Sequence, residues 1–188
     1  MIKRYIAILL IGVSALSFGQ ALWISVKAEL AQILIKNAWQ DSIDSQTIEK
    51  PWTWADTWPV GRLMHPNSET DLYILEGAQG NALAFGPGRH SDSALLGKGI
   101  TVIGGHKDTH FAFLKHVELG DMMQLQLLDG RWLPYRVADK QVYDSSKGPL
   151  PVATSGFYVY LVTCYPFNSL DSFSSGGPLR LVITLSLS

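Results

Sequence analysis

The distribution of charged and apolar positions sets the N-terminal part of the chain apart from the rest. No Asp, Glu, Lys or Arg occurs from Tyr5 to Val26, and Lys3 and Arg4 precede this 22-residue run. As a helix the run would extend roughly 33 Å, enough to cross the hydrocarbon core of a membrane. The pattern therefore predicts a transmembrane helix near the N-terminus.

The helical pattern continues past the uncharged run, with apolar positions at helical spacing that include Leu30, Ile33 and Leu34. We therefore expect residues 1–40 to form an anchor helix and its extension. The basic residues before the run favour a cytoplasmic N-terminus, with the remaining chain across the membrane. A cleaved signal peptide is the alternative, because Ser17-Phe18-Gly19 offers small residues for a cleavage site.

Residues 41–57 are polar at first and then carry Pro51 and tryptophans, a composition typical of a linker. Trp52, Trp54 and Trp58 fit either a membrane interface or the outer surface of the following domain, and we favour the domain surface.

Residues 58–188 predict an all-β domain, because short β-prone runs alternate with turn signals and no long helical pattern appears. A hairpin is expected around Asp129-Gly130. About eight strands at this spacing favour a closed barrel or a sandwich. The expected strands are VGRLMH, DLYILEG, NALAFG, GITVIGGH, MMQLQLLDG, LPYRVADKQVYD, FYVYLVTC and LRLVITLSL.

Composition narrows the function classes. The formal net charge is −1, which gives no support for nucleic-acid binding, since such proteins usually carry a basic patch. The chain has one cysteine, Cys164, so an intramolecular disulfide is excluded. A lone thiol outside the cytoplasm is either buried and inert or kept free for use.

Three residues at strand ends carry candidate chemistry. His106 follows an apolar strand and two glycines, Gly104 and Gly105, which leave room for a ligand or another backbone. Cys164 ends the strand LVTC. Arg180 enters the apolar strand PLRLVITL, where a guanidinium must reach the surface or find an anionic partner.

Taken together, the three residue types match the needs of thiol catalysis. A free cysteine is only a few per cent thiolate at neutral pH, and a nearby cation raises that fraction. An imidazole can protonate a leaving amine, and a guanidinium can stabilise negative charge on a carbonyl oxygen.

At these residues the sequence resembles the sortases, membrane-anchored cysteine transpeptidases. The matching segments are TVIGGHKDTHF, LVTCYP and PLRLVI, in that order, and the likeness covers about residues 58–188. HKDTHF and TCYPF look most like the sortase class of Gram-negative bacteria.

The resemblance implies an eight-stranded sortase-type β-barrel with short helices as the catalytic domain, 58–188. It assigns catalysis to His106, Cys164 and Arg180. The implied substrate is a protein with a C-terminal LPxTG-like sorting signal, whose acyl group passes from Cys164 to an amine acceptor of unknown identity. No metal or cofactor is implied. With the anchor, the resemblance implies the inner membrane, with the catalytic domain on the periplasmic side.

Neighbouring polar residues receive weaker assignments. Asp108 either orients His106 or is a solvated loop residue. Thr163 either lines the peptide groove or is an ordinary strand residue. His90 is expected to shape the rim of the site without a catalytic role. His110 follows His106 by four residues, but Lys107 occupies the position where a metalloprotease helix carries Glu, so a zinc site is not expected.

Two other functions remain open on sequence alone. A thiol hydrolase would use the same residues with water in place of the amine. A non-catalytic, membrane-tethered binding module would use the same barrel without the thiol.

Overall fold

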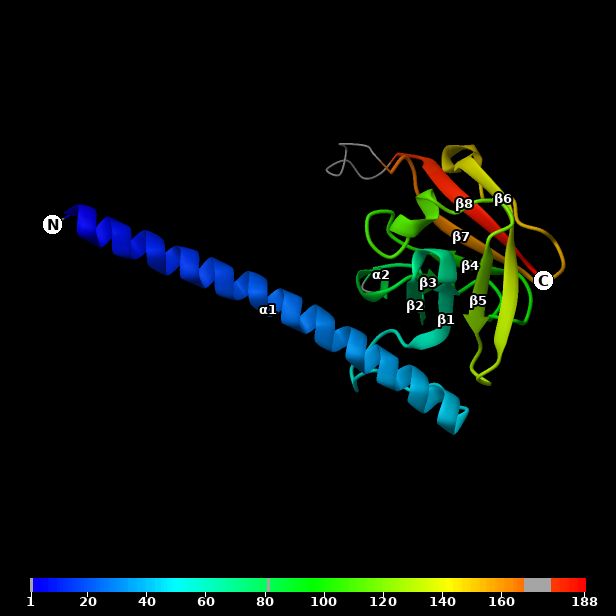
Figure 1. The fold of residues 1–188 in the computed structure, drawn as a ribbon, viewed down its shortest axis with the longest axis horizontal. Coiled ribbons are helices and arrows are strands. Elements are labelled where there is room, and N and C mark those ends of the chain that lie inside the picture. Colours follow the sequence, from blue (N-terminus) through cyan, green and yellow to red (C-terminus); the bar gives the residue numbers. More distant parts are fainter. Residues whose placement is uncertain (1, 81, 168–176) are drawn as a thin grey trace.

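Eight strands close into a barrel in the part of the chain that the computed structural model describes, residues 2–80, 82–167 and 177–188. Their order around the barrel is β1-β2-β3-β4-β7-β8-β6-β5 (Figure 1). The predicted eight-stranded barrel is therefore confirmed. The strands are β1 (Pro59–His65), β2 (Thr70–Glu76), β3 (Gly88–Arg89), β4 (Thr101–Gly104), β5 (Met122–Gln126), β6 (Trp132–Asp144), β7 (Tyr158–Cys164) and β8 (Leu179–Leu187).

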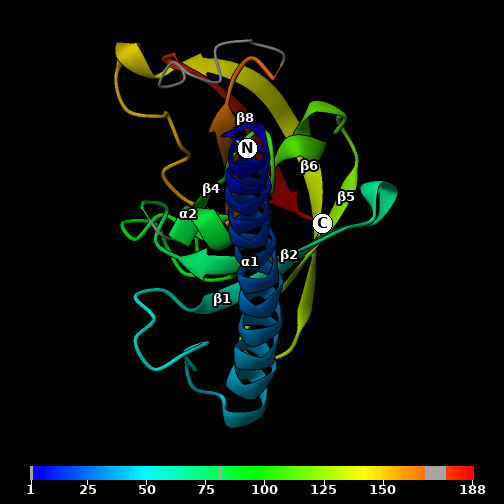
Figure 2. The same cartoon turned by 90° about the vertical axis from the view of Figure 1, so that its left-hand side faces the viewer.

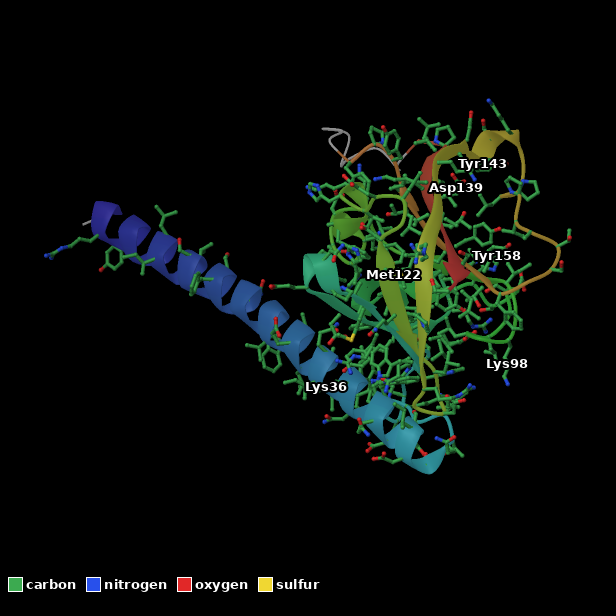
Figure 3. All side chains as sticks on the ribbon, turned by 45° about the vertical axis from the view of Figure 1, so that its right-hand side comes forward. Lys36, Lys98, Met122, Asp139, Tyr143 and Tyr158 are labelled. Atoms are coloured by element: carbon green, nitrogen blue, oxygen red, sulfur yellow. The ribbon has the colours of Figure 1, made fainter. Side chains whose placement is uncertain are left out.

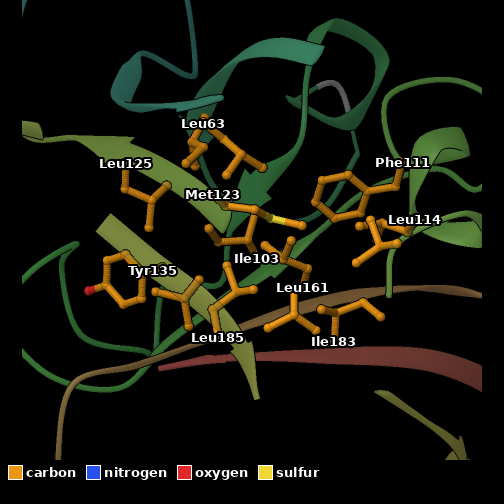
Figure 4. Close-up of a cluster of buried hydrophobic side chains, with 14 of the residues drawn as sticks. Leu63, Ile103, Phe111, Leu114, Met123, Leu125, Tyr135, Leu161, Ile183 and Leu185 are labelled. Atoms are coloured by element: carbon orange, nitrogen blue, oxygen red, sulfur yellow. The ribbon is translucent and has the colours of Figure 1, made fainter. Parts of the chain in front are cut away.

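Alternating side chains of these strands fill the barrel. Leu63, Ile103, Leu161 and Ile183 come from four different strands, are fully buried and belong to one core cluster (Figure 4). Because successive residues of a strand point to opposite faces, their sequence neighbours lie on the outside of the barrel. This alternation decides which side of the wall carries each candidate site residue.

Of two local predictions, the hairpin at a recognisable turn sequence is confirmed and one short strand is wrong. The hairpin around Asp129-Gly130 is confirmed, since β5 pairs antiparallel with β6 and Gly130 has a φ of 81°. The predicted strand NALAFG is wrong, because Ala82–Phe85 forms the short helix α2. A short apolar run does not distinguish helix from strand by its periodicity, and Gly86 and Pro87 end this one after a single turn.

The described residues contain four helical segments besides α2. The long helix α1 spans Ile2–Ser45, and three short 3-10 helices are η1 (Pro66–Ser68), η2 (Ala112–Lys115) and η3 (Ser145–Lys147). The expected short helices are therefore present.

The C-terminal part of α1 packs on the barrel. Ala31, Ile35, Ala38 and Trp39 are buried, and α1 contacts β1, β2 and α2. The Trp39 Nε1–H donates a hydrogen bond to Gln126 Oε1 at 3.0 Å. In Figure 2, α1 runs from top to bottom in front of the barrel. This part of the helix is therefore integral to the folded domain.

The segment predicted as a linker is more ordered than expected. Residues 41–45 extend α1 to Ser45. Beyond the helix, Pro51, Ala55 and Thr57 are buried against the domain. The periodic positions from Leu30 to Ala38 predicted a helix but gave no sign of where it would meet the barrel.

The three tryptophans of this segment behave differently. Trp52 is half-buried and packs edge to face on Phe85, with ring centroids 5.4 Å apart. Trp58 is also half-buried, beneath the Lys50 ammonium. Trp54 is 84% exposed. Two of the three therefore lie on the domain surface as favoured.

The N-terminal part of α1 extends away from the barrel (Figure 1). Among the residues that the structure describes, no helix combines the length and hydropathy of a membrane span. The transmembrane anchor therefore stays a prediction.

Trp39→Ala is expected to lower the free energy of unfolding by about 3 to 5 kcal/mol, because it removes a fully buried indole and its hydrogen bond to Gln126. Chemical denaturation of the full chain measures this change. Trp54→Ala is the matched control and should shift stability by less than about 0.5 kcal/mol. Equal effects of the two variants would show that α1 does not stabilise the barrel.

Candidate active site

Two strand pairings bring the three predicted catalytic residues to one end of the barrel. Cys164, the last residue of β7, is the direct cross-strand partner of Arg180 in β8. On the other side of β7, Val162 pairs in parallel with Gly104 of β4. His106 follows Gly104 by two residues, as Cys164 follows Val162. Three residues distant in sequence are therefore neighbours at the ends of three adjacent strands.

The Cys164 and Arg180 side chains lie on the outer face of the barrel wall. Leu161 of β7 and Ile183 of β8 point into the core, so Cys164 and Arg180, each three residues away, point outward. Directly opposed residues of antiparallel strands have Cα atoms about 4.5 to 5.5 Å apart, which brings the two side chains within reach of each other. Cys164 is a free, half-buried thiol, and His106 is exposed.

Arg180 is held at its present position by the chain just before it. Its Nη1 donates to the carbonyl oxygens of Gly177 at 2.5 Å and Leu179 at 2.8 Å. Between His106, Cys164 and Arg180, all of which the structure describes, no direct hydrogen bond is formed. Catalytic hydrogen bonds often tighten only when substrate is bound, so this open arrangement is compatible with catalysis.

Thr163 supports this arrangement from inside the wall. It is 2% exposed, and its hydroxyl donates to the Gly105 carbonyl oxygen at 2.7 Å. The Gly105 N–H in turn donates to Val162 O at 3.1 Å. These bonds tie the turn that carries His106 to the strand that carries Cys164. The expectation that Thr163 lines a peptide groove does not match its inward orientation, which follows from the alternation along β7.

Gly105 has a packing role different from the one expected. A Cβ at this position would approach the Phe111 ring to 2.7 Å, and Phe111 is fully buried in the core. The space beside Gly105 is thus occupied by an aromatic ring. The Phe111 N–H also donates to His106 O at 3.0 Å, which closes the turn after β4.

Lys107 joins the histidine turn to the segment after the nucleophile. Its Nζ donates to Pro166 O at 2.8 Å, two residues beyond Cys164. In the sequence, Lys107 bears only on the zinc question, where it argues against a metal site. Its place in the sequence, between His106 and Asp108, does not predict the bond to Pro166.

Among the described residues, neither Asp108 nor His90 forms a side-chain bond with His106, Cys164 or Arg180. Both are exposed, and in the described part of the chain Asp108 forms no hydrogen bond or ion pair with His106. His90 Nδ1 lies 3.9 Å from the Asp92 carboxylate. Neither side chain is held against Cys164 by a bond that the structure shows.

His110 is close enough to His106 for their charges to interact. Burial holds the pKa of the His110 imidazole below its usual value, and the neighbouring His106 lowers that pKa further. The described residues contain no group of three His, Cys, Asp or Glu side chains arranged to hold a metal ion.

An apolar floor borders Cys164 on the outer face. Val162 pairs with Val182 of β8, and Tyr160 lies two residues before Val162. The Tyr160 hydroxyl accepts a hydrogen bond from the Ala153 N–H at 3.0 Å, so the segment between β6 and β7 packs over this face. The apolar floor was not predicted from the sequence. Its residues are ordinary strand residues, and the pairing of β7 with β8 is needed to show that they share the outer face.

A family model described as a sortase domain matches residues 64–188. The chain belongs to the sortase family of cysteine transpeptidases, and Cys164 is its one cysteine. A comparison with curated protein sequences gives no match.

Solved sortase structures share the fold. Sortase A from Corynebacterium diphtheriae is 23% identical with a TM-score of 0.58, and the match covers 72% of this chain and 63% of that one. Sortase C-1 from Actinomyces oris is 25% identical with a TM-score of 0.56, covering 69% of this chain and 74% of that one. A pilus-related sortase C of Group B Streptococcus is 23% identical with a TM-score of 0.56, covering 69% and 67%.

His106→Gln is expected to raise the pKa of His110, because it removes a neighbouring positive charge that disfavours protonation of the His110 ring. Burial should still keep that pKa below the usual value. A pH titration of the imidazole NMR signals measures both effects. His65 is the internal control, since its pKa is lowered by burial and opposed by Asp121 without a contribution from His106. An unchanged His110 titration would show that the two rings do not interact.

Proposed function

We propose that this chain is a membrane-anchored sortase that cleaves an LPxTG-like sorting signal through a thioacyl intermediate on Cys164 and transfers the acyl group to an amine. The observation that carries the proposal is the strand register, which sets Cys164 opposite Arg180 and next to the β4 end that leads to His106. Each of the three residues then has a distinct chemical task.

In the first half of the reaction, the Cys164 thiolate, whose proton has passed to the His106 imidazole, attacks the carbonyl carbon of the scissile peptide bond. A carbon–sulfur bond forms, and negative charge develops on the carbonyl oxygen. Arg180 stabilises this charge, since a guanidinium has five N–H donors and the two bonds that hold Arg180 in place both come from Nη1. His106 gives a proton to the departing amine as the carbon–nitrogen bond breaks.

In the second half, an acceptor amine attacks the thioester carbon. The new carbon–nitrogen bond replaces the carbon–sulfur bond, His106 takes the proton from the attacking nitrogen, and Cys164 is regenerated. The sorting signal would approach Cys164 along the outer face beside the half-buried Val162, because Tyr160 and Val182 are already covered by the segment between β6 and β7. Apolar side chains of the signal would pack on Val162 while its scissile bond reaches the strand end.

The membrane anchor and the subclass belong to the same proposal. The uncharged run from Tyr5 to Val26 supports a span in the inner membrane, and the described apolar side chains of this part, such as Leu10, Ile11 and Phe18, are exposed on α1. The catalytic domain would then lie on the periplasmic side, as the basic residues before the run favour. The motifs HKDTHF and TCYPF support the Gram-negative class.

Incubation of the full chain with an LPxTG-like peptide is expected to give a thioester on Cys164, detected by mass spectrometry. Cys164→Ala should give none. His106→Ala should slow thioester formation about 100-fold or more, and Arg180→Lys should do so by a similar factor, because lysine lacks the planar fork of donors.

His90→Ala is the matched control and should leave the rate unchanged, since the His90 side chain is exposed and, among the described residues, Asp92 is its one ion-pair neighbour. Product mass with and without an added amine separates transfer from hydrolysis. If Cys164→Ala retains full function, the chain is a binding module and the proposal is wrong.

A further inference from the structure

A cavity of about 330 Å³ opens at the end of the barrel that carries Cys164. Tyr165 directly follows Cys164, and Leu181 directly follows Arg180, and both line this cavity. Because side chains alternate along a strand, Leu181 points to the inner side of the wall while Arg180 points outward. The rim cavity, as we name this space, and the catalytic thiol therefore occupy two sides of the same strand ends. The lining residues are Lys115, Lys140, Tyr165, Pro166, Phe167 and Leu181.

The charged residues that line the rim cavity are both lysines. Lys140 is the cross-strand partner of the core residue Ile183 and therefore projects to the inner side of the wall. Its Nζ donates to the carbonyl oxygens of Val117 at 2.7 Å and Lys115 at 3.1 Å. An ammonium group has three N–H donors, so these two bonds fix its position and leave one donor.

No carboxylate in the described part of the chain forms an ion pair with Lys115 or Lys140. Two further cations, Lys107 and Arg180, lie around the same strand ends. The nearby Asp144 carboxylate accepts hydrogen bonds from the Ser146 N–H and hydroxyl. Clustered positive charge at the mouth of a low-dielectric barrel attracts anions.

We propose that the rim cavity binds an anionic group of the acceptor, so that the acceptor is a primary amine with a phosphate or carboxylate close to it. The acceptor assignment rests on the proposed sortase function, whereas the binding of an anion does not. An anion held between Lys115 and Lys140 at the rim would let an amine attached to it reach round the end of β7 to the thioester, because Tyr165, the residue after Cys164, lines the cavity. Such positioning raises the effective concentration of the amine over that of water.

Isothermal titration of the full chain with inorganic phosphate at low salt tests the site itself. Saturable binding in the millimolar range is expected, and Lys115→Ala should weaken it several-fold. Lys98→Ala is the matched control, because Lys98 and Tyr143, the cross-strand partner of Arg180, lie toward opposite ends of the barrel (Figure 3). No saturable binding, or an equal loss in the Lys98 variant, would overturn the proposal.

Lys140→Ala should also weaken phosphate binding. Its two bonds to backbone carbonyls make a loss of stability possible for this variant, so its thermal unfolding is measured alongside. The exposed Lys115 makes no such side-chain bond in the described structure, and its variant decides the outcome if the Lys140 variant does not fold.

Competition between amines tests the acceptor class. Ethanolamine, O-phosphoethanolamine and β-alanine present a primary amine with no anion, a phosphate or a carboxylate. The two anionic amines should capture the thioester about fivefold better than ethanolamine, relative to hydrolysis, as expected for a partly exposed ion pair. High salt and Lys115→Ala should reduce this preference, and Lys98→Ala should not.

Each outcome of the competition is informative. Stronger capture by O-phosphoethanolamine indicates a phosphate-bearing acceptor, and stronger capture by β-alanine indicates a carboxylate-bearing one. Equal capture of all three amines would overturn the acceptor assignment while leaving the sortase function intact. If no thioester forms, the proposed function fails, and the phosphate titration still decides whether the rim cavity binds anions.

Discussion

The pairing of β7 with two different neighbours is the constraint on which the site depends. Parallel pairing with β4 and antiparallel pairing with β8 make the ends of three strands coincide, so that the chain after Gly104, the residue Cys164 and the residue Arg180 meet at one place. The core holds the register, because a shift by one residue would turn Leu161 outward and Cys164 inward. Packing inside the barrel therefore fixes chemistry outside it.

Several contacts make this strand end rigid. Thr163 binds the Gly105 carbonyl from within the wall, Phe111 occupies the space beside Gly105, and Lys107 joins the histidine turn to Pro166. The outer side carries the thiol and an apolar floor, whereas the inner side carries the lysines of the rim cavity. We infer that the two sides serve the two substrates, with the sorting signal outside and the anionic group of the acceptor inside.

The sequence allowed the main features to be predicted because they depend on local signals. The Asp129-Gly130 turn and the alternating runs predicted the barrel strands, and the strand-end positions of His106, Cys164 and Arg180 singled them out. Features that depend on long-range register were missed. The helix Ala82–Phe85 looked like a strand because its apolar run is too short for a period, and β3 has only two residues.

The roles of Thr163 and Lys140 show the same limit. The role of each residue depends on whether its side chain points into the barrel or outward. This direction is known only when the pairing with the neighbouring strands is known. The docking of α1 through Trp39 likewise depends on a partner, Gln126, far away in the sequence.

A crystal structure of the chain with a sorting-signal peptide trapped covalently on Cys164 tests the central claim most directly. The account predicts that the peptide lies on the outer face along β7, with its carbonyl oxygen at the Arg180 guanidinium and His106 beside the bond that breaks. A peptide that enters the barrel from the inner side, or a carbonyl oxygen remote from Arg180, would contradict it.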